Sequence, residues 1–252
     1  MVLTGRFLCY HLGEPSTAIG GVPNRARAFG GHVPGRSGRE TACDLKHGGN
    51  VDDAVREALV ESARLKERLA HEMSEDISRA AGLVVAALRG GGKVLIFGNG
   101  GSAADAQHIA CELVGFFTRE RPAWPAIALT TDTSVMTSVS NDLGYEQVFA
   151  RQIEALAQAG DVAIAISTSG NSPNIVAGAR TARERGCTVI GLTGAGGGKL
   201  AAEVDLNLAV PSKVTPRIQD AHITIGHIIC GLVEDELAGP KGPADPTVDR
   251  AE

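Results

Sequence analysis

The stretch DVAIAISTSGNSP, residues 161–173, decides the fold. Its first six residues, Asp161 and the five apolar residues that follow it, are typical of a parallel strand that helices cover on both faces. A hydroxyl-rich loop around Gly170 follows. Pro173 then suits the first turn of a helix, where a backbone N–H has no helical partner. The stretch predicts a strand, a polar loop and a helix, in that order.

The same order recurs along the chain. Further strands are expected at 93–97, 126–129, 188–192 and 206–210, and helices at 103–116, after Asp132, and at 145–159, 173–185 and 215–237. Strands that alternate with helices form crossover units and a parallel sheet. We therefore expect an α/β protein, a flavodoxin-like three-layer αβα sandwich with a parallel five-stranded sheet. Ligands of such sheets bind beyond the carboxyl ends of the strands, where the polar loops lie.

Two helices are expected before the first strand. Apolar residues recur at helical spacing from Val51, and Ser74 begins a second helix that stops at the glycines 90–92. Residues 1–48 hold scattered Gly, Pro and Arg with no sustained period, so we expect a flexible extension there. The folded domain should cover 49–238. The segment 239–252, which contains three prolines, should be a disordered tail.

Composition excludes several classes of protein. The formal net charge of −5 argues against a nucleic-acid-binding surface, which needs clustered Lys and Arg. The five cysteines have no CxxC spacing, so neither a disulfide framework nor a zinc ribbon is indicated. The chain has neither a membrane-length apolar run nor a signal-peptide pattern, and a cytoplasmic protein is expected.

The hydroxyls of the loop after 166 predict a phosphate site. They converge with free backbone N–H groups on the positive end of a helix dipole, which suits a dianionic phosphate monoester. The alternative is a helix N-cap with extra polar residues, for which one Ser would suffice. No GxxxxGK loop is present, and the turn at 98–102 lacks GxGxxG spacing, so no nucleotide cofactor is expected and NAD binding is the weaker alternative. The loop residues concerned are Ser167, Thr168, Ser169 and Ser172.

Two helices carry candidate acid/base residues. His108 and Glu112 share one helix face, and Gln219 and His227, eight residues apart, lie near one face of the last helix. A carboxylate, a second acid/base group and a divalent metal would meet the needs of an aldose–ketose isomerase, which passes through an enediol. The alternative is a surface His–Glu hydrogen bond and a His held in the core.

Five motifs in order resemble one family. They are GNGGS at 98–102, DAxHxxxE at 105–112, SNDxG at 140–144, STSGNS at 167–172 and RIQxxHxxxxH at 217–227. Together they resemble the phosphoheptose (sedoheptulose-7-phosphate) isomerases of the sugar-isomerase (SIS) domain superfamily. The resemblance implies a homotetramer with sites at subunit interfaces. It also implies conversion of D-sedoheptulose 7-phosphate to D-glycero-D-manno-heptose 7-phosphate, which feeds nucleotide-activated heptose synthesis.

The resemblance also implies residue roles. Glu112 is the expected base and His227 its acid/base partner. One Zn²⁺ per subunit is expected on His108, Glu112, Gln219 and His227. The expected substrate contacts are Asn99, Gly100, Gly101, Ser102, Asp132, Ser167, Thr168, Ser169, Ser172 and Gln219.

Alternatives of the same fold remain open. They are an isomerase of another phosphosugar, a non-catalytic tetrameric partner of the replication initiator, and a phosphosugar-sensing regulator. The regulator usually carries a helix-turn-helix domain, for which residues 1–48 show no pattern. Cys111 and Pro216 stand where some relatives carry acidic residues, which bears on fine substrate contacts.

Overall fold

The computed structural model describes residues 51–239. The predicted extension at 1–48 and all but the first residue of the predicted tail at 239–252 lie outside the described residues. No helix in the described part of the chain is long and apolar enough to cross a membrane.

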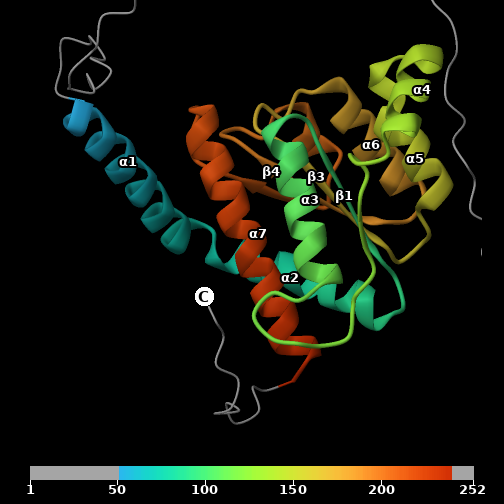
Figure 1. Ribbon diagram of the computed structural model, residues 1–252, viewed down its shortest axis with the longest axis horizontal. Helices are drawn as coiled ribbons and strands as arrows, with labels where there is room; N and C mark the ends of the chain where they lie inside the picture. Colours follow the sequence, from blue (N-terminus) through green and yellow to red (C-terminus); the bar gives the residue numbers. More distant parts are fainter. Residues whose placement is uncertain (1–50, 240–252) are drawn as a thin grey trace, which may run out of the picture. The chain divides into compact units, whose positions relative to one another are not determined.

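The sheet has five parallel strands in the order β2-β1-β3-β4-β5. Figure 1 labels β1, β3 and β4 of this sheet. Their bounds are β1 (Val94–Gly98), β2 (Ala126–Ala128), β3 (Val162–Ser167), β4 (Thr188–Thr193) and β5 (Leu206–Ala209). The prediction of a parallel five-stranded sheet is confirmed, and each strand lies within two residues of its expected bounds. The central strands β1 and β3 are buried along their whole length, as their apolar sequences require.

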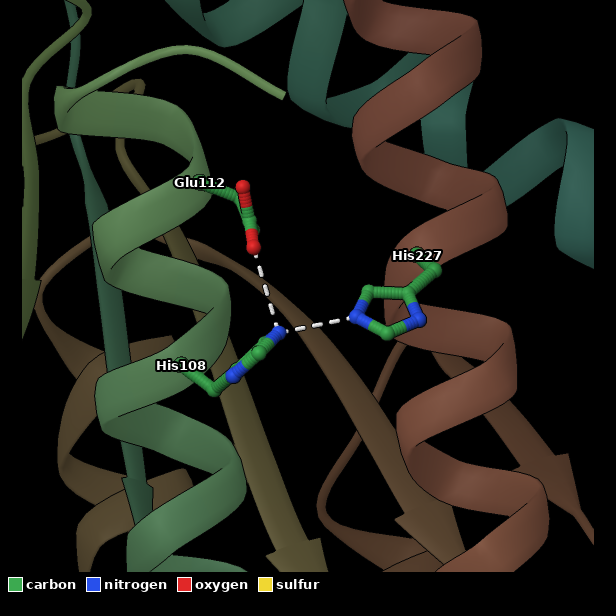
Figure 2. Close-up of side chains that lie close together, drawn as sticks. All are labelled: His108, Glu112 and His227. Atoms are coloured by element: carbon green, nitrogen blue, oxygen red, sulfur yellow. Dashed lines mark hydrogen bonds and ion pairs between the residues drawn. The ribbon is translucent and has the colours of Figure 1, made fainter. Parts of the chain in front are cut away.

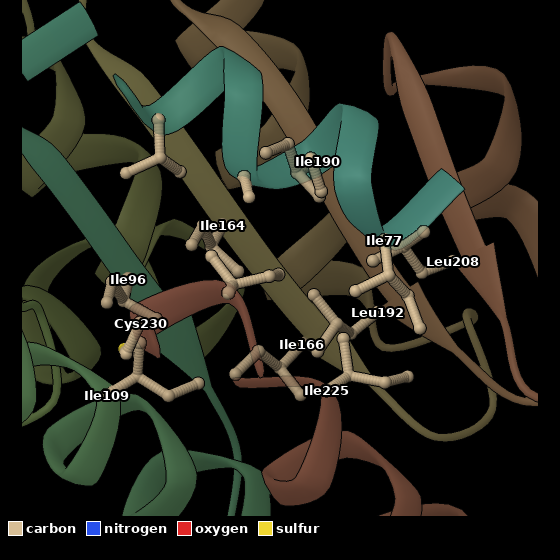
Figure 3. Close-up of a cluster of buried hydrophobic side chains, with 14 of the residues drawn as sticks. Ile77, Ile96, Ile109, Ile164, Ile166, Ile190, Leu192, Leu208, Ile225 and Cys230 are labelled. Carbon is tan, nitrogen blue, oxygen red and sulfur yellow. The ribbon is translucent and has the colours of Figure 1, made fainter. Parts of the chain in front are cut away.

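Helices cover both faces of the sheet. One face packs against α2 (Ser74–Arg89), α3 (Gly101–Val114) and α7 (Thr215–Leu237); Figure 3 shows Ile96, Ile164 and Ile190 in this layer. The other face packs against α5 (Val148–Leu156) and α6 (Pro173–Glu184), with α4 (Thr133–Leu143) beside them. Alternate residues of a strand point to opposite faces, so Phe97 packs on Phe149 in the second layer. The αβα sandwich is confirmed.

The first helix, α1 (Val51–Glu72), is buried only near its end. Leu65 and Leu69 are buried, but the apolar residues of the first half of the helix are exposed: Val51, Val55, Leu59 and Val60. The two predicted N-terminal helices are therefore present. The apolar stripe of α1 is only half covered by the described residues.

The helix expected at 145–159 is shorter than predicted. Residues Tyr145–Gln147 form a 3₁₀ turn (η1), and α5 ends at Leu156. The buried carboxylate of Asp161 accepts the Gln158 N–H at 2.8 Å, which takes that donor away from the helix. A further 3₁₀ turn, η2 (Gly198–Ala202), follows the glycines after β4.

Candidate active site

The hydroxyl-rich loop joins β3 to α6 without using its hydroxyls as helix caps. Ser167 is buried at the end of β3, and its Oγ lies 3.3 Å from Oγ of Ser172. Ser172 is the N-cap residue of α6, yet its side chain makes no capping hydrogen bond. Gly170 turns the loop with a φ of +64°. The simple N-cap interpretation requires a capping bond that Ser172 does not make. The binding of an anion at this helix N-terminus stays a prediction.

A second loop, rich in glycine, supports the first. The Gly194 N–H donates to the Thr168 carbonyl at 3.0 Å, and the Leu200 N–H donates to the Gly170 carbonyl at 2.9 Å. A Cβ built on Gly170 would lie only 2.0 Å from the carbonyl oxygen of Gly197, so no side chain fits there. The two loops form one unit. The sequence shows the glycines at 194–198 but not the loop on which they pack.

The turn after β1 is tied to the start of α6. The side-chain amides of Asn99 and Asn174 exchange two hydrogen bonds of 2.9 Å each, and the Tyr145 hydroxyl donates to Asn99 Oδ1 at 3.1 Å. The sequence named Asn99 as a substrate contact but missed Asn174 and Tyr145. Asn174 is buried. Its position directly after the Pro that opens α6 is the sequence feature that could have indicated a role at this end of the helix. The turn at 98–102 therefore lies beside the hydroxyl-rich loop.

The other predicted substrate-contact residues differ in how exposed they are and in what they contact. Gly100 and Gly101 are exposed, whereas the Ser102 side chain is buried beneath the turn. Gln219 lies against Gly101, because a Cβ built on that glycine would be 2.3 Å from Gln219 Nε2. Asp132 is exposed and caps α4 by accepting the Val135 N–H at 3.0 Å.

The acid/base residues from α3 and α7 meet in one cluster, shown in Figure 2. Nε2 of His108 lies 2.8 Å from Nε2 of His227 and 3.1 Å from Oε1 of Glu112. His108 therefore lies between the two predicted catalytic residues. The His108 side chain is 48% exposed and that of Glu112 is 20% exposed, so a ligand can reach the cluster.

Sequence comparison assigns the family. Residues 59–194 match the SIS domain family. A phosphoheptose isomerase of Rhodospirillum rubrum is 57% identical over 161 residues, which cover 64% of this chain and 86% of the relative. The chain belongs to the phosphoheptose isomerases of the SIS domain family.

Solved structures agree with this assignment. The phosphoheptose isomerase of Neisseria gonorrhoeae aligns with a TM-score of 0.70 at 43% identity, over 74% of this chain and all of that one. The phosphoheptose isomerase of Francisella tularensis aligns with a TM-score of 0.72 at 37% identity, again over 74% of this chain and 100% of that one. The sandwich of this SIS domain is thus the fold of these enzymes.

The histidine–glutamate cluster of this SIS domain suits a divalent metal. One ligand atom from each of the three residues lies within 4.8 Å of the other two. Two imidazoles and a carboxylate are zinc ligands. Within the described residues Gln219 makes no hydrogen bond to the cluster, so its place in the metal set stays a prediction.

A fourth ionisable group lies one turn before the cluster on α3. Burial raises the pKa of Asp105 to about 6, although the charge of His108 opposes this shift. Its Oδ2 has no hydrogen-bond partner among the described residues. The sequence placed Asp105 in a motif but assigned it no role, because its burial depends on packing that spacing does not reveal.

Proposed function

We propose that the protein isomerises D-sedoheptulose 7-phosphate to D-glycero-D-manno-heptose 7-phosphate. This is the first step of nucleotide-activated heptose synthesis. The observation that carries the proposal is the cluster in which His108 joins Glu112 to His227 across two helices. The phosphoheptose isomerases that are 37–57% identical to the chain support the choice of substrate.

In the proposed reaction Glu112 is the base. It takes a proton from C1 of the ketose, the electrons form the C1–C2 double bond, and the C2 carbonyl oxygen gains a proton. Return of a proton to C2 and loss of the proton from O1 then give the aldose. His227 is the acid/base group that serves the oxygens. His108 contacts both Glu112 and His227, which supports a role for His108 in orienting these two side chains.

The substrate phosphate is proposed to bind the hydroxyl-rich loop after β3. The hydroxyls of this loop and the N-terminus of α6 suit a dianion. We propose that the turn at 98–101, Asp132 and Gln219 contact the sugar hydroxyls, and the link between Asn99 and Asn174 supports this by holding that turn beside the loop. The full proposed set is Asn99, Gly100, Gly101, Ser102, Asp132, Ser167, Thr168, Ser169, Ser172 and Gln219.

One zinc ion per subunit is proposed on His108, Glu112 and His227, with Gln219 as the fourth ligand. When bound, the metal would stabilise negative charge that develops on the sugar oxygens. The donor set and its spacing support this proposal.

We further propose a cytoplasmic homotetramer with its sites at subunit interfaces. Large apolar side chains are exposed on and beside the helices of the cluster: Val114, Phe116, Ile228 and Leu232. The uncovered half of α1 exposes further apolar side chains. Exposed apolar surface beyond scattered single side chains is typical of protein interfaces. Light scattering on the purified protein tests the oligomer, which should have four times the mass of one 26.0 kDa chain.

Two other functions of the same fold predict different behaviour. An isomerase of a six-carbon phosphosugar would turn over D-fructose 6-phosphate faster than the heptulose. A non-catalytic partner of the replication initiator would turn over neither sugar. The test is the kcat/KM of the purified protein on each phosphosugar, with and without chelator. A preference of at least about a hundredfold for the heptulose supports the proposal, and equal or lower activity on it overturns the proposal.

A further inference from the structure

One buried carboxylate of α7 fastens the segment 115–121, which follows α3. Glu234 is 1% exposed and accepts the Phe117 N–H at 3.0 Å, the Thr118 N–H at 2.9 Å and the Thr118 hydroxyl at 2.6 Å. Burial would raise the pKa of Glu234, but the hydrogen bonds from Thr118 and Phe117 and the charge of Arg121 lower it. Glu234 is therefore ionised at neutral pH, and all the bonds that it accepts converge on this segment.

Arg121 links the same carboxylate to the end of α3. Its Nε lies 3.4 Å from Oε1 of Glu234, and its guanidinium donates to the backbone carbonyl of Glu112 at 2.7 Å and to that of Leu113 at 2.8 Å. The last carbonyls of a helix have no helical partners, so Arg121 supplies the missing donors. The guanidinium also lies 3.6 Å above the ring of Trp124. The segment is thus held to both helices that carry the acid/base residues.

The segment places an aromatic ring on His227. The Phe117 and His227 ring centroids are 5.6 Å apart, with 30° between the planes. A Cβ built on Gly231, one turn further along α7, would lie 3.4 Å from Phe117 Cε1, so the ring also lies beside Gly231. The backbone of Phe117 is held by Glu234, and its side chain contacts the imidazole.

We infer that Glu234 is a positioning residue that fixes His227 through Phe117. A charged, buried hydrogen-bond network permits little movement of the segment, because any shift would leave buried polar groups unpaired. The ring then limits the orientation of the His227 imidazole. Acid/base groups must be held within about 0.5 Å of their productive positions, so a small loosening lowers turnover. The kinetic consequence rests on the proposed function, whereas the structural relationship does not.

The test uses Glu234→Gln, Phe117→Leu and the double variant. Each single change should lower kcat about tenfold and leave KM within twofold, because the phosphate loop is untouched. If Glu234 acts through Phe117, the double variant should be no slower than the slower single variant. The matched control is Glu236→Gln, which removes an exposed carboxylate that pairs with Arg89, and its kcat should equal that of the wild type.

A second readout does not need turnover. In NMR spectra of protein labelled at histidine, the His227 ring signals, identified by their loss in His227→Gln, should carry a ring-current shift from Phe117. Both Phe117→Leu and Glu234→Gln should change that shift, and Glu236→Gln should not. If Glu234→Gln does not fold, Thr118→Val weakens the same carboxylate contact and should give the same change.

Wild-type protein that turns over neither phosphosugar would refute the proposed function, while the NMR result would still decide the positioning role. His227 signals that are unchanged in the Glu234 and Thr118 variants, or additive kcat losses in the double variant, would overturn the inference.

Discussion

Nε2 of His108 and Nε2 of His227 lie 2.8 Å apart, although 119 residues separate them in the sequence. The contact exists because α3 and α7 pack side by side on one face of the sheet (Figure 1). Gly226 permits this close approach, since a Cβ there would lie 2.7 Å from Cδ1 of Ile109. Without that packing, Glu112 and His227 would be two unrelated surface groups.

Replacing Glu112 by Gln should reduce kcat by at least about a hundredfold, the usual effect of removing a general base. The amide is nearly isosteric with the carboxylate but is not basic, so thermal unfolding should be unchanged within a few degrees. The measurement is the initial rate at saturating heptulose phosphate, with the zinc content of each preparation recorded. Glu184→Gln, an exposed change on α6, is the control. Full activity of the Glu112 variant would rule out this residue as the base.

Ser169→Ala should raise KM for the phosphosugar about tenfold with kcat within twofold. A hydrogen bond to a charged phosphate contributes about 1.5 kcal/mol, which is close to a tenfold effect. In the free protein the Ser169 hydroxyl accepts the Asn171 N–H at 3.1 Å, so some loss of loop order accompanies the change. Ser138→Ala, at an exposed position of α4, serves as the comparison. Equal KM values for all three proteins would count against the phosphate site.

Metal analysis should find about one zinc per chain in the wild type and none in His108→Ala. The imidazole that lies between Glu112 and His227 is then missing, and the remaining donors, Glu112 and His227 with Gln219, bind zinc weakly. His71→Ala, an exposed change in the last turn of α1, should retain the metal. Zinc retention in the His108 variant would place the ion elsewhere.

Stability should fall in mild acid because of His222. Burial lowers its pKa to about 4, and a hydrogen bond of 3.1 Å to the Thr193 carbonyl opposes this only in part. The unfolded chain protonates this His near pH 6.5. The contribution of the neutral, buried His222 to the free energy of unfolding is therefore complete above about pH 6.5. It is lost progressively as the pH falls toward 4.

His222→Gln tests this pH dependence, because the amide can still donate to Thr193 but does not titrate. The wild type should have the higher Tm at pH 7, and its advantage should shrink between pH 6.5 and 4.5. A constant difference in Tm across that range would contradict the assignment.

The sequence predicted the elements of the fold well because their signals are local. The run 162–166 is apolar throughout and is followed by Gly170 and Pro173, so its strand, loop and helix could be assigned from neighbouring residues. The spacing of His108 and Glu112 likewise placed both on one face of α3. The recognised motifs then gave the family, which sequence comparison confirms.

The features that the sequence missed depend on long-range contacts. The pairing of Asn99 with Asn174 joins residues 75 apart, and Glu234 reaches back 117 residues to the Phe117 N–H. The burial of Asp161 and its bond to Gln158 shorten α5, and periodicity does not show such a bond. The substrate and metal roles of Asp132 and Gln219 stay predictions.

The most direct test of the account is NMR of the purified protein with D-sedoheptulose 7-phosphate in D₂O. Isomerisation through an enediol predicts formation of the aldoheptose 7-phosphate, with solvent deuterium at C2 in a measurable fraction of the product. The Glu112→Gln variant should form neither product nor deuterated substrate. Folded wild-type protein, loaded with zinc, that leaves the heptulose phosphate unconverted and free of deuterium would contradict the account.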